Sequence, residues 1–308
     1  MDLRKHQWDL VTCKDLLLWY EHASFIPSCT PDSIWVFGGA NQSGNRNCLQ
    51  VLNPQTRTRT TPEVTSPPQS PRTFHTSSAA IEKQLYVFRV GERGVHPLQD
   101  IKLHVFDANT LTWSQPETLG NPPSPRCGHV MMAAGTKLFI RGALAGDKLY
   151  VNLHCIDISG MKWQKLSPTG AALTGCAAHS AVALGKHLCI FGGMTLAGAL
   201  GTMYQYHTEK QHWTLLKLDT FLPAGRLDHS MWNILWPVTC ASEKEDSSSL
   251  TLNHEAEKGD SGDSADTVMT HIGDSHEESQ ADTLLCFVFG GMSTEGKIYD
   301  DCIVTVVD

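Results

Sequence analysis

Five histidines recur along the sequence at nearly equal intervals, and their type and spacing are the first features that could support chemistry. His22, His75, His129, His179 and His229 are separated by 53, 54, 50 and 50 residues. Imidazole rings can bind metals or transfer protons. A side chain that recurs once per repeat can equally pack each unit against its neighbour. We interpret these histidines, and the arginines that precede several of them, as structural residues that hydrogen-bond neighbouring loops.

The other candidates for catalysis or metal binding are isolated in the sequence. Cys176 and His179 have half of a zinc-ligand spacing, but no second half follows. The acidic pair Asp300-Asp301 lies beside a predicted strand start, where a turn or solvent role is expected. Motifs for phosphate-binding loops, zinc proteases, serine hydrolases and CxxC thiols do not occur. The sequence therefore predicts no enzyme, no catalytic or metal-binding residue and no cofactor.

Each repeated histidine begins a unit of about 50 residues composed of short β-strands. The second strand of each unit is an apolar run that ends on Gly-Gly or an altered pair, at 34–39, 85–90, 138–143, 188–193 and 286–291. A third apolar run follows, and a tryptophan then recurs at Trp113, Trp163 and Trp213. This period, with Gly-Gly and Trp, is typical of kelch repeats. Such sheets stack radially into a β-propeller.

We predict one all-β domain over 1–308, a kelch-repeat β-propeller with five recognisable blades and an N-terminal partial blade. The predicted blades are 11–62, 63–115, 116–165, 166–216 and 217–308. Residues 1–10 form the partial blade or closing strand, because Trp8 lies at the spacing of the other tryptophans. Two closures remain open. Either the Trp8 strand completes the last blade of a five-bladed ring, or the chain is part of a larger propeller.

Three departures from the repeat predict a weakened fold. Arg59 lies near the register of the tryptophans, Arg89-Val90 replaces one Gly-Gly, and Arg141 precedes the altered pair Gly142-Ala143. Loss of a buried tryptophan costs about 3–5 kcal/mol, and a Cβ in the left-handed region costs about 1–2 kcal/mol. We hypothesise that the chain is an N-terminally shortened, diverged copy that folds poorly.

Charge is concentrated in one segment of the chain. Residues 242–282 hold 12 acidic residues and 2 lysines, whereas the whole chain has a formal charge of −8. The remainder is nearly neutral without a basic stripe, which argues against nucleic acid as a partner. The segment 241–283 is predicted to be a disordered acidic insertion between two strands. Ser242 and Ser275 each precede an acid by three residues, so an acidophilic kinase is among the predicted partners of this loop.

Location follows from what the sequence lacks. The ten cysteines are scattered without a CxxC pair, and the first residues lack the apolar core of a signal peptide. No run approaches the length of a membrane-spanning helix. We expect a cytoplasmic protein with no direct membrane insertion.

The whole chain resembles the Rab effector proteins with kelch motifs. The stretches that carry this resemblance are WVFGGANQSGN at 35–45, LHVFDANTLTW at 103–113 and IYDDCIVTVVD at 298–308. The resemblance implies a non-enzymatic scaffold that binds a GTP-loaded late-endosomal Rab GTPase. It further implies a peripheral place on late endosomes and a role in receptor transport from endosomes to the trans-Golgi network. It provides no binding motif, so the partner-binding residues are unknown.

Other functions remain open at this point. The chain could be a degenerate, truncated copy without binding activity. It could also be a kelch substrate adaptor for a ubiquitin ligase, or a kelch enzyme of the copper-radical oxidase or specifier type. An oxidase needs metal ligands that converge on the propeller axis together with tyrosine, and the sequence has only six tyrosines.

Overall fold

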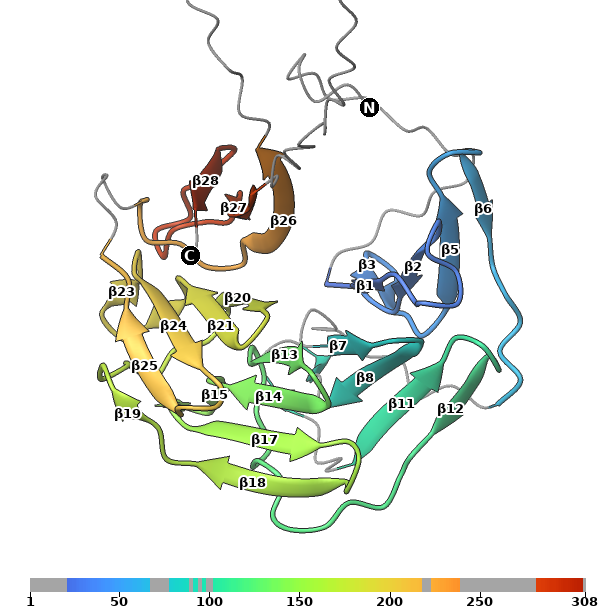
Figure 1. Cartoon of the computed structure of the whole chain (residues 1–308), viewed down its shortest axis with the longest axis horizontal. Coiled ribbons are helices and arrows are strands. Elements are labelled where there is room, and N and C mark those ends of the chain that lie inside the picture. The colour runs from blue at the N-terminus through green and yellow to red at the C-terminus, as the bar shows by residue number, and fades with distance from the viewer. Residues whose placement is uncertain are drawn as a thin grey trace, which may run out of the picture.

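The structure is a computed structural model that describes residues 21–66, 78–88, 91–93, 96–97, 102–217, 223–238 and 281–306. In these residues the secondary structure consists of β-strands, without a helix. Five antiparallel sheets are arranged around a common axis (Figure 1). The predicted all-β propeller with five blades is confirmed.

The first three blades each have four strands. The first blade contains β1 (Ala23–Phe25), β2 (Ile34–Phe37), β5 (Leu49–Asn53) and β6 (Thr58–Thr60). The second contains β7 (Ser78–Ile81), β8 (Gln84–Phe88), β11 (Leu103–Asp107) and β12 (Thr112–Ser114). The third contains β13 (Val130–Ala134), β14 (Lys137–Arg141), β17 (Leu153–Asp157) and β18 (Lys162–Leu166). Within each blade the strands pair in chain order, from the axis outward.

The last two blades vary this plan. The fourth contains β20 (Ser180–Leu184), β21 (His187–Phe191), β24 (Met203–His207) and β25 (His212–Leu215), with β19 (Thr169–Gly170) parallel to the outer strand. The fifth has three described strands, β26 (Ser230–Val238), β27 (Ala281–Phe289) and β28 (Cys302–Val306).

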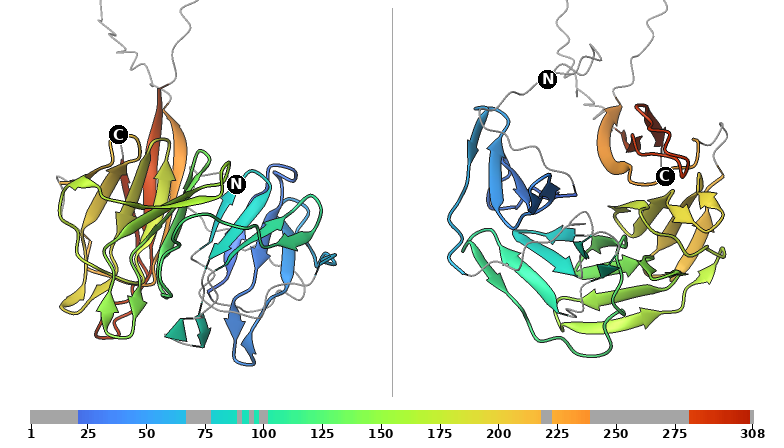
Figure 2. Two further views of the ribbon diagram at one scale, coloured as in Figure 1. Left: turned by 90° about the horizontal axis from the view of Figure 1, so that it is seen from below. Right: turned by 180° about the vertical axis from the view of Figure 1, so that it is seen from behind.

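Short hairpins connect the second and third strands of the first four blades. They are β3 (Ala40–Asn41) with β4 (Gly44–Asn45), β9 (Gly91–Arg93) with β10 (His96–Pro97), β15 (Leu144–Ala145) with β16 (Lys148–Leu149), and β22 (Met194–Thr195) with β23 (Gly198–Ala199). In the side view of Figure 2 (left) these hairpins project from one side of the ring.

The cores lie between blades, because each sheet is covered on both faces. In β17, Leu153 and Cys155 pack toward the fourth blade, whereas Ile156 packs toward the second. The strand is therefore buried along nearly its whole length, as expected for a sheet between two layers. The described residues form four such clusters, one at each junction between successive blades.

The recurring tryptophans occupy the first three of these junctions. Trp113, Trp163 and Trp213 lie on the outermost strands and pack back onto the preceding blade. The Trp163 ring lies 4.9 Å from that of Phe88, centroid to centroid. Burial of such large rings stabilises each junction, as the sequence predicts.

Arg59 lies on the outermost strand of the first blade. It lies opposite Leu52 in β6, in the register of the tryptophans. Neither Arg59 nor Leu52 belongs to the cluster between the first and second blades. Arg59 instead donates a hydrogen bond to Gln50 Oε1 at 3.3 Å. The later tryptophans each pack onto the preceding blade, and the described clusters include no junction before the first blade, so the predicted cost of Arg59 stays a prediction.

Two predicted boundaries are wrong by small amounts. Strand β27 begins at Ala281, so residues 281–283 belong to a strand and not to the acidic insertion. Strand β18 ends at Leu166, one residue beyond the predicted blade limit at 165. The segments 1–20 and 239–280, with Trp8, Ser242 and Ser275, lie outside the described residues. So do His75 and Arg89-Val90. The hypothesis of a poorly folding chain stays a prediction.

Candidate partner-binding surface

One side of the propeller, which we call the hairpin rim, is made of three elements. These are the short hairpins, the loop 292–298 and the segments that lead into β13, β20 and β26. Backbone bridges join each lead-in segment to the hairpin or loop of its own blade. The bridged pairs are Cys127–Leu144, Ala177–Met194 and Leu227–Met292. The loops of this rim are therefore held in fixed positions by the backbone.

A buried arginine lies beneath the rim in the fifth blade. Arg226 is 1% exposed and forms an ion pair with Asp301, with nitrogen–oxygen distances of 2.6 and 3.0 Å. It also donates to the Gly290 carbonyl at 3.0 Å and lies 4.4 Å from the centre of the Tyr299 ring. The hydrogen bond from Arg226 lowers the pKa of Asp301. The expected turn or solvent role of Asp300-Asp301 is thus incomplete, because Asp301 anchors a buried cation.

The third blade repeats this arrangement with a neutral partner. Arg126 donates to Asn152 Oδ1 at 2.8 Å and to the Gly142 carbonyl at 3.1 Å. Its guanidinium carbon lies 4.2 Å from the centre of the Tyr150 ring. Burial lowers the pKa of Arg126 to about 10, at which it is still protonated at neutral pH. The predicted role of the repeated arginines, hydrogen bonding to neighbouring loops, is confirmed for Arg126 and Arg226.

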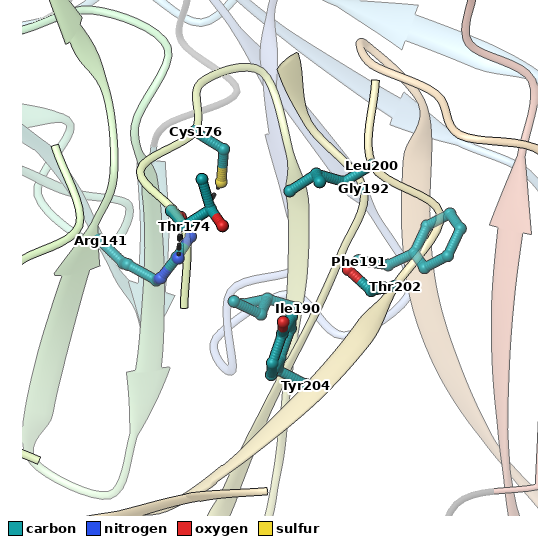
Figure 3. A pocket seen from close by; sticks show the side chains of 9 residues that line it. All are labelled: Arg141, Thr174, Cys176, Ile190, Phe191, Gly192, Leu200, Thr202 and Tyr204. Atoms are coloured by element: carbon teal, nitrogen blue, oxygen red, sulfur yellow. Dashed lines mark hydrogen bonds between the residues drawn. The ribbon is translucent and has the colours of Figure 1, made fainter. Parts of the chain in front are cut away.

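The fourth blade has no arginine at the position of Arg126 and Arg226. Cys176, Leu200 and Thr202 stand where the third blade has Arg126, Tyr150 and Asn152. Figure 3 shows that Arg141 extends into this place from the third blade. It donates to the Thr174 carbonyl and to Cys176 Sγ, both at 3.0 Å. A cavity of about 10 Å³ remains, with room for one water molecule at most.

His179 and His229 each pack against the glycine pair, or its altered form, of the preceding blade. A Cβ added at Gly142 would lie 2.5 Å from His179 Cε1, and one added at Gly192 would lie 2.6 Å from His229 Cε1. Each ring thus occupies the space that the first glycine of the preceding blade leaves free. Burial lowers the pKa of His229 to about 4. Burial, followed by the charge of Arg141, also lowers the pKa of His179. Both rings are neutral at physiological pH.

A backbone feature next to these histidines was not predicted from the sequence. The residue before each described histidine has a left-handed backbone, with φ of 55° at Glu21, 68° at Gly128, 55° at Ala178 and 53° at Asp228. This conformation lets the Asp228 amide donate to the Ala178 carbonyl, and the Ala178 amide to the Gly128 carbonyl, both at 3.0 Å. These bonds link successive blades near the axis. Only one of the four residues is glycine, so the sequence pattern gives little signal.

The described residues contain no group of three or more His, Cys, Asp or Glu side chains that could hold a metal ion. Cys176 contacts Arg141, so the half zinc spacing of Cys176 and His179 has an explanation in the buried network. Within the same residues, no helix has the length and apolarity needed to cross a bilayer.

Exposed apolar side chains are unevenly distributed between the two rims. On the hairpin rim, Leu196 is 87% exposed and Ile298 is 77% exposed. Met292, in the same loop as Ile298, and Val151, just after β16 in the third blade, are exposed as well. The opposite side, which we call the turn rim, consists of the turns between first and second strands and between third and fourth strands. In the described part of the chain, Ile26 is a large exposed apolar residue within these turns, and exposed Leu119 lies beside one of them, with its amide bonded to the Met161 carbonyl. The hairpin rim is therefore the candidate surface for a partner, since apolar residues form interface cores.

Comparison with known proteins matches this architecture. A family model described as the KLHDC2/KLHL20/DRC7 Kelch-repeats domain matches residues 1–193 and 91–236. The human Rab9 effector protein with kelch motifs is 82% identical over the whole chain, which spans 82% of that protein. The Xenopus laevis protein of the same name is 44% identical over the whole chain and 81% of its own length. Bovine Kelch domain-containing protein 2 is 32% identical over 46% of the chain and 33% of its own length. The chain belongs to the kelch-repeat family of Rab9 effector proteins with kelch motifs.

Proposed function

We propose that the chain is a non-enzymatic effector that binds a Rab GTPase in its GTP form through the hairpin rim. The names of the full-length matches support the class of partner. The observation that carries the choice of surface is the position of Leu196 and Ile298. These two strongly exposed apolar residues lie on loops that the backbone bridges and Arg226 hold in place.

The entropy cost of association favours a binding surface that is already ordered. A surface whose loops are already ordered loses less conformational entropy on binding than a mobile surface. The bridge between Leu227 and Met292 fixes the start of the loop that carries Ile298. The hairpin that carries Leu196 is fixed in the same way by the bridge between Ala177 and Met194. An apolar patch on a rigid rim provides a suitable interface core.

Nucleotide selectivity is a property of the proposed partner. The switch segments of a GTPase are ordered by the γ-phosphate and its magnesium ion, and they are released on hydrolysis. A rigid rim fits one of these two conformations. We therefore expect the chain to bind the GTP form and to release the GDP form.

The proposed cellular role follows from this partner. The chain is cytoplasmic, reaches late endosomes peripherally through the GTPase, and supports receptor transport from endosomes to the trans-Golgi network. An acidophilic kinase that acts on the acidic insertion remains part of the proposal. Imaging of a tagged chain in cells tests the location, because a rim variant that cannot bind the GTPase should lose its endosomal signal.

The binding experiment uses purified chain and the Rab9 GTPase that the relatives' names identify. The GTPase is loaded with GDP or with a non-hydrolysable GTP analogue, and affinity is measured by calorimetry. Leu196→Asp combined with Ile298→Asp should weaken binding of the GTP form by at least about tenfold, since burying an unpaired charge is costly.

The matched control is Leu119→Asp. Leu119 is also strongly exposed, but it lies at the outer edge of the third blade, beside Lys162. The Leu119→Asp variant should bind the GTP-loaded GTPase with the same affinity as the unaltered chain. Equal binding of the GDP and GTP forms would contradict the effector proposal, and unchanged binding by the rim variant would contradict the choice of surface.

A further inference from the structure

The fourth blade places two histidines opposite each other at the turn rim. His187 begins β21 and His207 ends β24, and the two residues are paired in the register of these antiparallel strands. Directly opposed residues of a sheet point to the same face, with Cβ atoms about 4.5–5.5 Å apart. The centres of the two imidazole rings are 4.8 Å apart, and the ring planes are nearly perpendicular. Both side chains are half-buried, so each ring keeps contact with solvent.

This pair departs from the repeat at its position on the third strand. The last residue of that strand is Asn53 in the first blade, Asp107 in the second and Asp157 in the third. In each case the side-chain oxygen accepts a hydrogen bond from a backbone amide of the turn that follows. His207 serves the turn through Nδ1, which accepts a hydrogen bond from the Lys210 amide at 3.3 Å. An amide or a carboxylate is sufficient for this turn, so the turn alone does not account for a histidine.

The position opposite departs from the repeat as well. Gln84 lies opposite Asp107 in the second blade, and Lys137 lies opposite Asp157 in the third. Both partners suit a carboxylate, and the Gln84 amide donates to Asp107 at 3.3 Å. In the fourth blade the partner is a second imidazole. A neutral imidazole has a nitrogen lone pair, so both members of this pair can bind a metal ion.

The separation of the two rings suits a metal ion that both bind. Zinc–nitrogen bonds are about 2.0–2.1 Å long and meet near the tetrahedral angle. Two imidazole rings that share one zinc ion therefore have centres about 5 Å apart. The distance between His187 and His207 is already close to this value. The χ2 torsion of histidine is broad, so each ring can turn toward a common ion from its present strand position.

The charges around the pair are compatible with a bound cation. Lys186 precedes His187, but its Nζ is paired with the Glu209 carboxylate at 2.9 Å. Lys210 is exposed, so its charge is screened by solvent and salt. Burial, followed by the charges of His207 and Lys210, lowers the pKa of His187. The His187 ring is therefore neutral at pH 7, as a metal ligand must be.

We propose that His187 and His207 bind a divalent transition-metal ion of the zinc class at the turn rim, with water in the remaining coordination positions. Two protein ligands make an open site, which agrees with the lack of a group of three among the described residues. Binding through Nε2 of His207 leaves the ring proton on Nδ1, so the Lys210 amide exchanges its long bond for one with water. The site lies across the ring from the hairpin rim and does not depend on the proposed GTPase surface.

His212 provides a matched control in the same row of the sheet. It lies opposite His207 on β25 and is exposed. Its Nδ1, however, is 3.0 Å from the Thr169 hydroxyl. Its ring packs over Gly170, where an added Cβ would lie 2.6 Å from the imidazole Cε1. This ring is thus held against β19, and we expect it to stay outside the site.

Modification with diethyl pyrocarbonate, mapped by tandem mass spectrometry of peptides, tests the proposal one ring at a time. The unaltered chain is used without a polyhistidine tag, at neutral pH, with and without zinc chloride. Saturating zinc should slow modification of His187 and His207 at least about fivefold, since only the free ring reacts. It should leave His212 unchanged, and magnesium chloride should protect none of the three, because magnesium prefers oxygen ligands. Equal protection of His212, or no protection of the pair, would overturn the proposal.

Two variants test whether the rings share one ion. His207→Asn keeps an acceptor for the turn, as Asn53 does, and His187→Gln copies Gln84 of the second blade. Each should abolish zinc protection of the remaining histidine, because one imidazole alone loses the gain of a joined pair of ligands. His212→Ala should preserve the protection of both. Thermal unfolding without zinc checks that each variant is folded. Full protection of the remaining ring in folded His207→Asn or His187→Gln would contradict a shared site.

Discussion

The two rims of the propeller are built from the same repeats but differ in how their loops are held. On the hairpin rim, Arg126 and Arg226 are both 1% exposed and bind loop carbonyls from inside. On the turn rim, short turns are held by exposed polar groups. Asp157, for example, accepts hydrogen bonds from the Ser159 amide and hydroxyl. Because buried arginines hold the loops of the hairpin rim, its exposed positions can be apolar. On the turn rim, by contrast, the exposed side chains themselves form the hydrogen bonds that stabilise the turns.

The largest expected effect comes from removing the arginine of the hairpin rim. Arg226→Met should destabilise the chain by about 2–4 kcal/mol, since it leaves Asp301 and the Gly290 carbonyl without their buried donor. The loop 292–298 should loosen, and binding of the GTPase should weaken with it. Thermal unfolding and calorimetry measure the two effects.

The turn rim provides the control for this variant. Lys186 and Glu209 form an exposed ion pair at 2.9 Å, with side chains 65% and 60% exposed. Lys186→Met should change stability by less than about 0.5 kcal/mol, because exposed pairs contribute little. Similar losses from Arg226→Met and Lys186→Met would contradict the difference between the rims.

As the pH falls, the stability contributed by buried groups of the hairpin rim should be lost before that contributed by the turn rim. His229 has a folded-state pKa of about 4, below its ordinary value of 6.5, because the ring is buried. The unfolded chain therefore binds more protons between these two values, and stability falls as the pH drops from about 6.5 towards 4. The expected loss from His229 at pH 5 is about 2 kcal/mol, and His179 should add to it in the same direction.

The turn rim responds in a lower pH range. Hydrogen bonds from Ser159 lower the pKa of Asp157 below its ordinary value of 3.8. Its contribution is present above that value and is lost only as the pH falls below it. Chemical denaturation at a series of pH values measures both ranges. The variant His229→Gln should flatten the slope between pH 6.5 and 5, and an unchanged slope would show that this ring does not titrate on unfolding.

The smallest expected effect concerns the altered Gly-Gly pair of the third blade. Ala143 is fully buried with φ of 111°, a region that L-residues rarely adopt. Ala143→Gly should stabilise the chain by about 1 kcal/mol through release of this strain. The reciprocal change Gly193→Ala should destabilise it, since the new Cβ would lie 2.8 Å from His179 Cβ. The denaturant midpoint of unfolding should rise for Ala143→Gly and fall for Gly193→Ala.

Much of the fold follows from sequence periodicity, because each repeat must bury the same faces. The recurrence of His, Gly-Gly and Trp predicts the blades and the structural role of Arg126 and Arg226. The period does not predict contacts between blades. Arg141 reaches the fourth blade because Cys176 leaves space there, a compensation between positions 35 residues apart. The left-handed residues before the histidines are also missed, since Glu21, Ala178 and Asp228 are not typical of that conformation.

The candidate surface could not be found from the sequence for a related reason. Leu196 and Ile298 are ordinary apolar residues in turn-rich segments, and only the structure places both on one rim. Exposure depends on neighbouring blades that are distant in sequence, so no local pattern marks it. The identity of the partner class, in contrast, comes from similarity over the whole chain and not from any single motif.

The most direct test of the account is the footprint of the bound GTPase on the two rims. Hydrogen–deuterium exchange is measured on the chain alone, with GDP-loaded GTPase and with GTPase loaded with a non-hydrolysable GTP analogue. We predict that the GTP form slows exchange in 194–199 and 292–298 and leaves the turns of the opposite rim unchanged. Protection of the turn rim alone, or no difference between the two nucleotide states, would contradict the account.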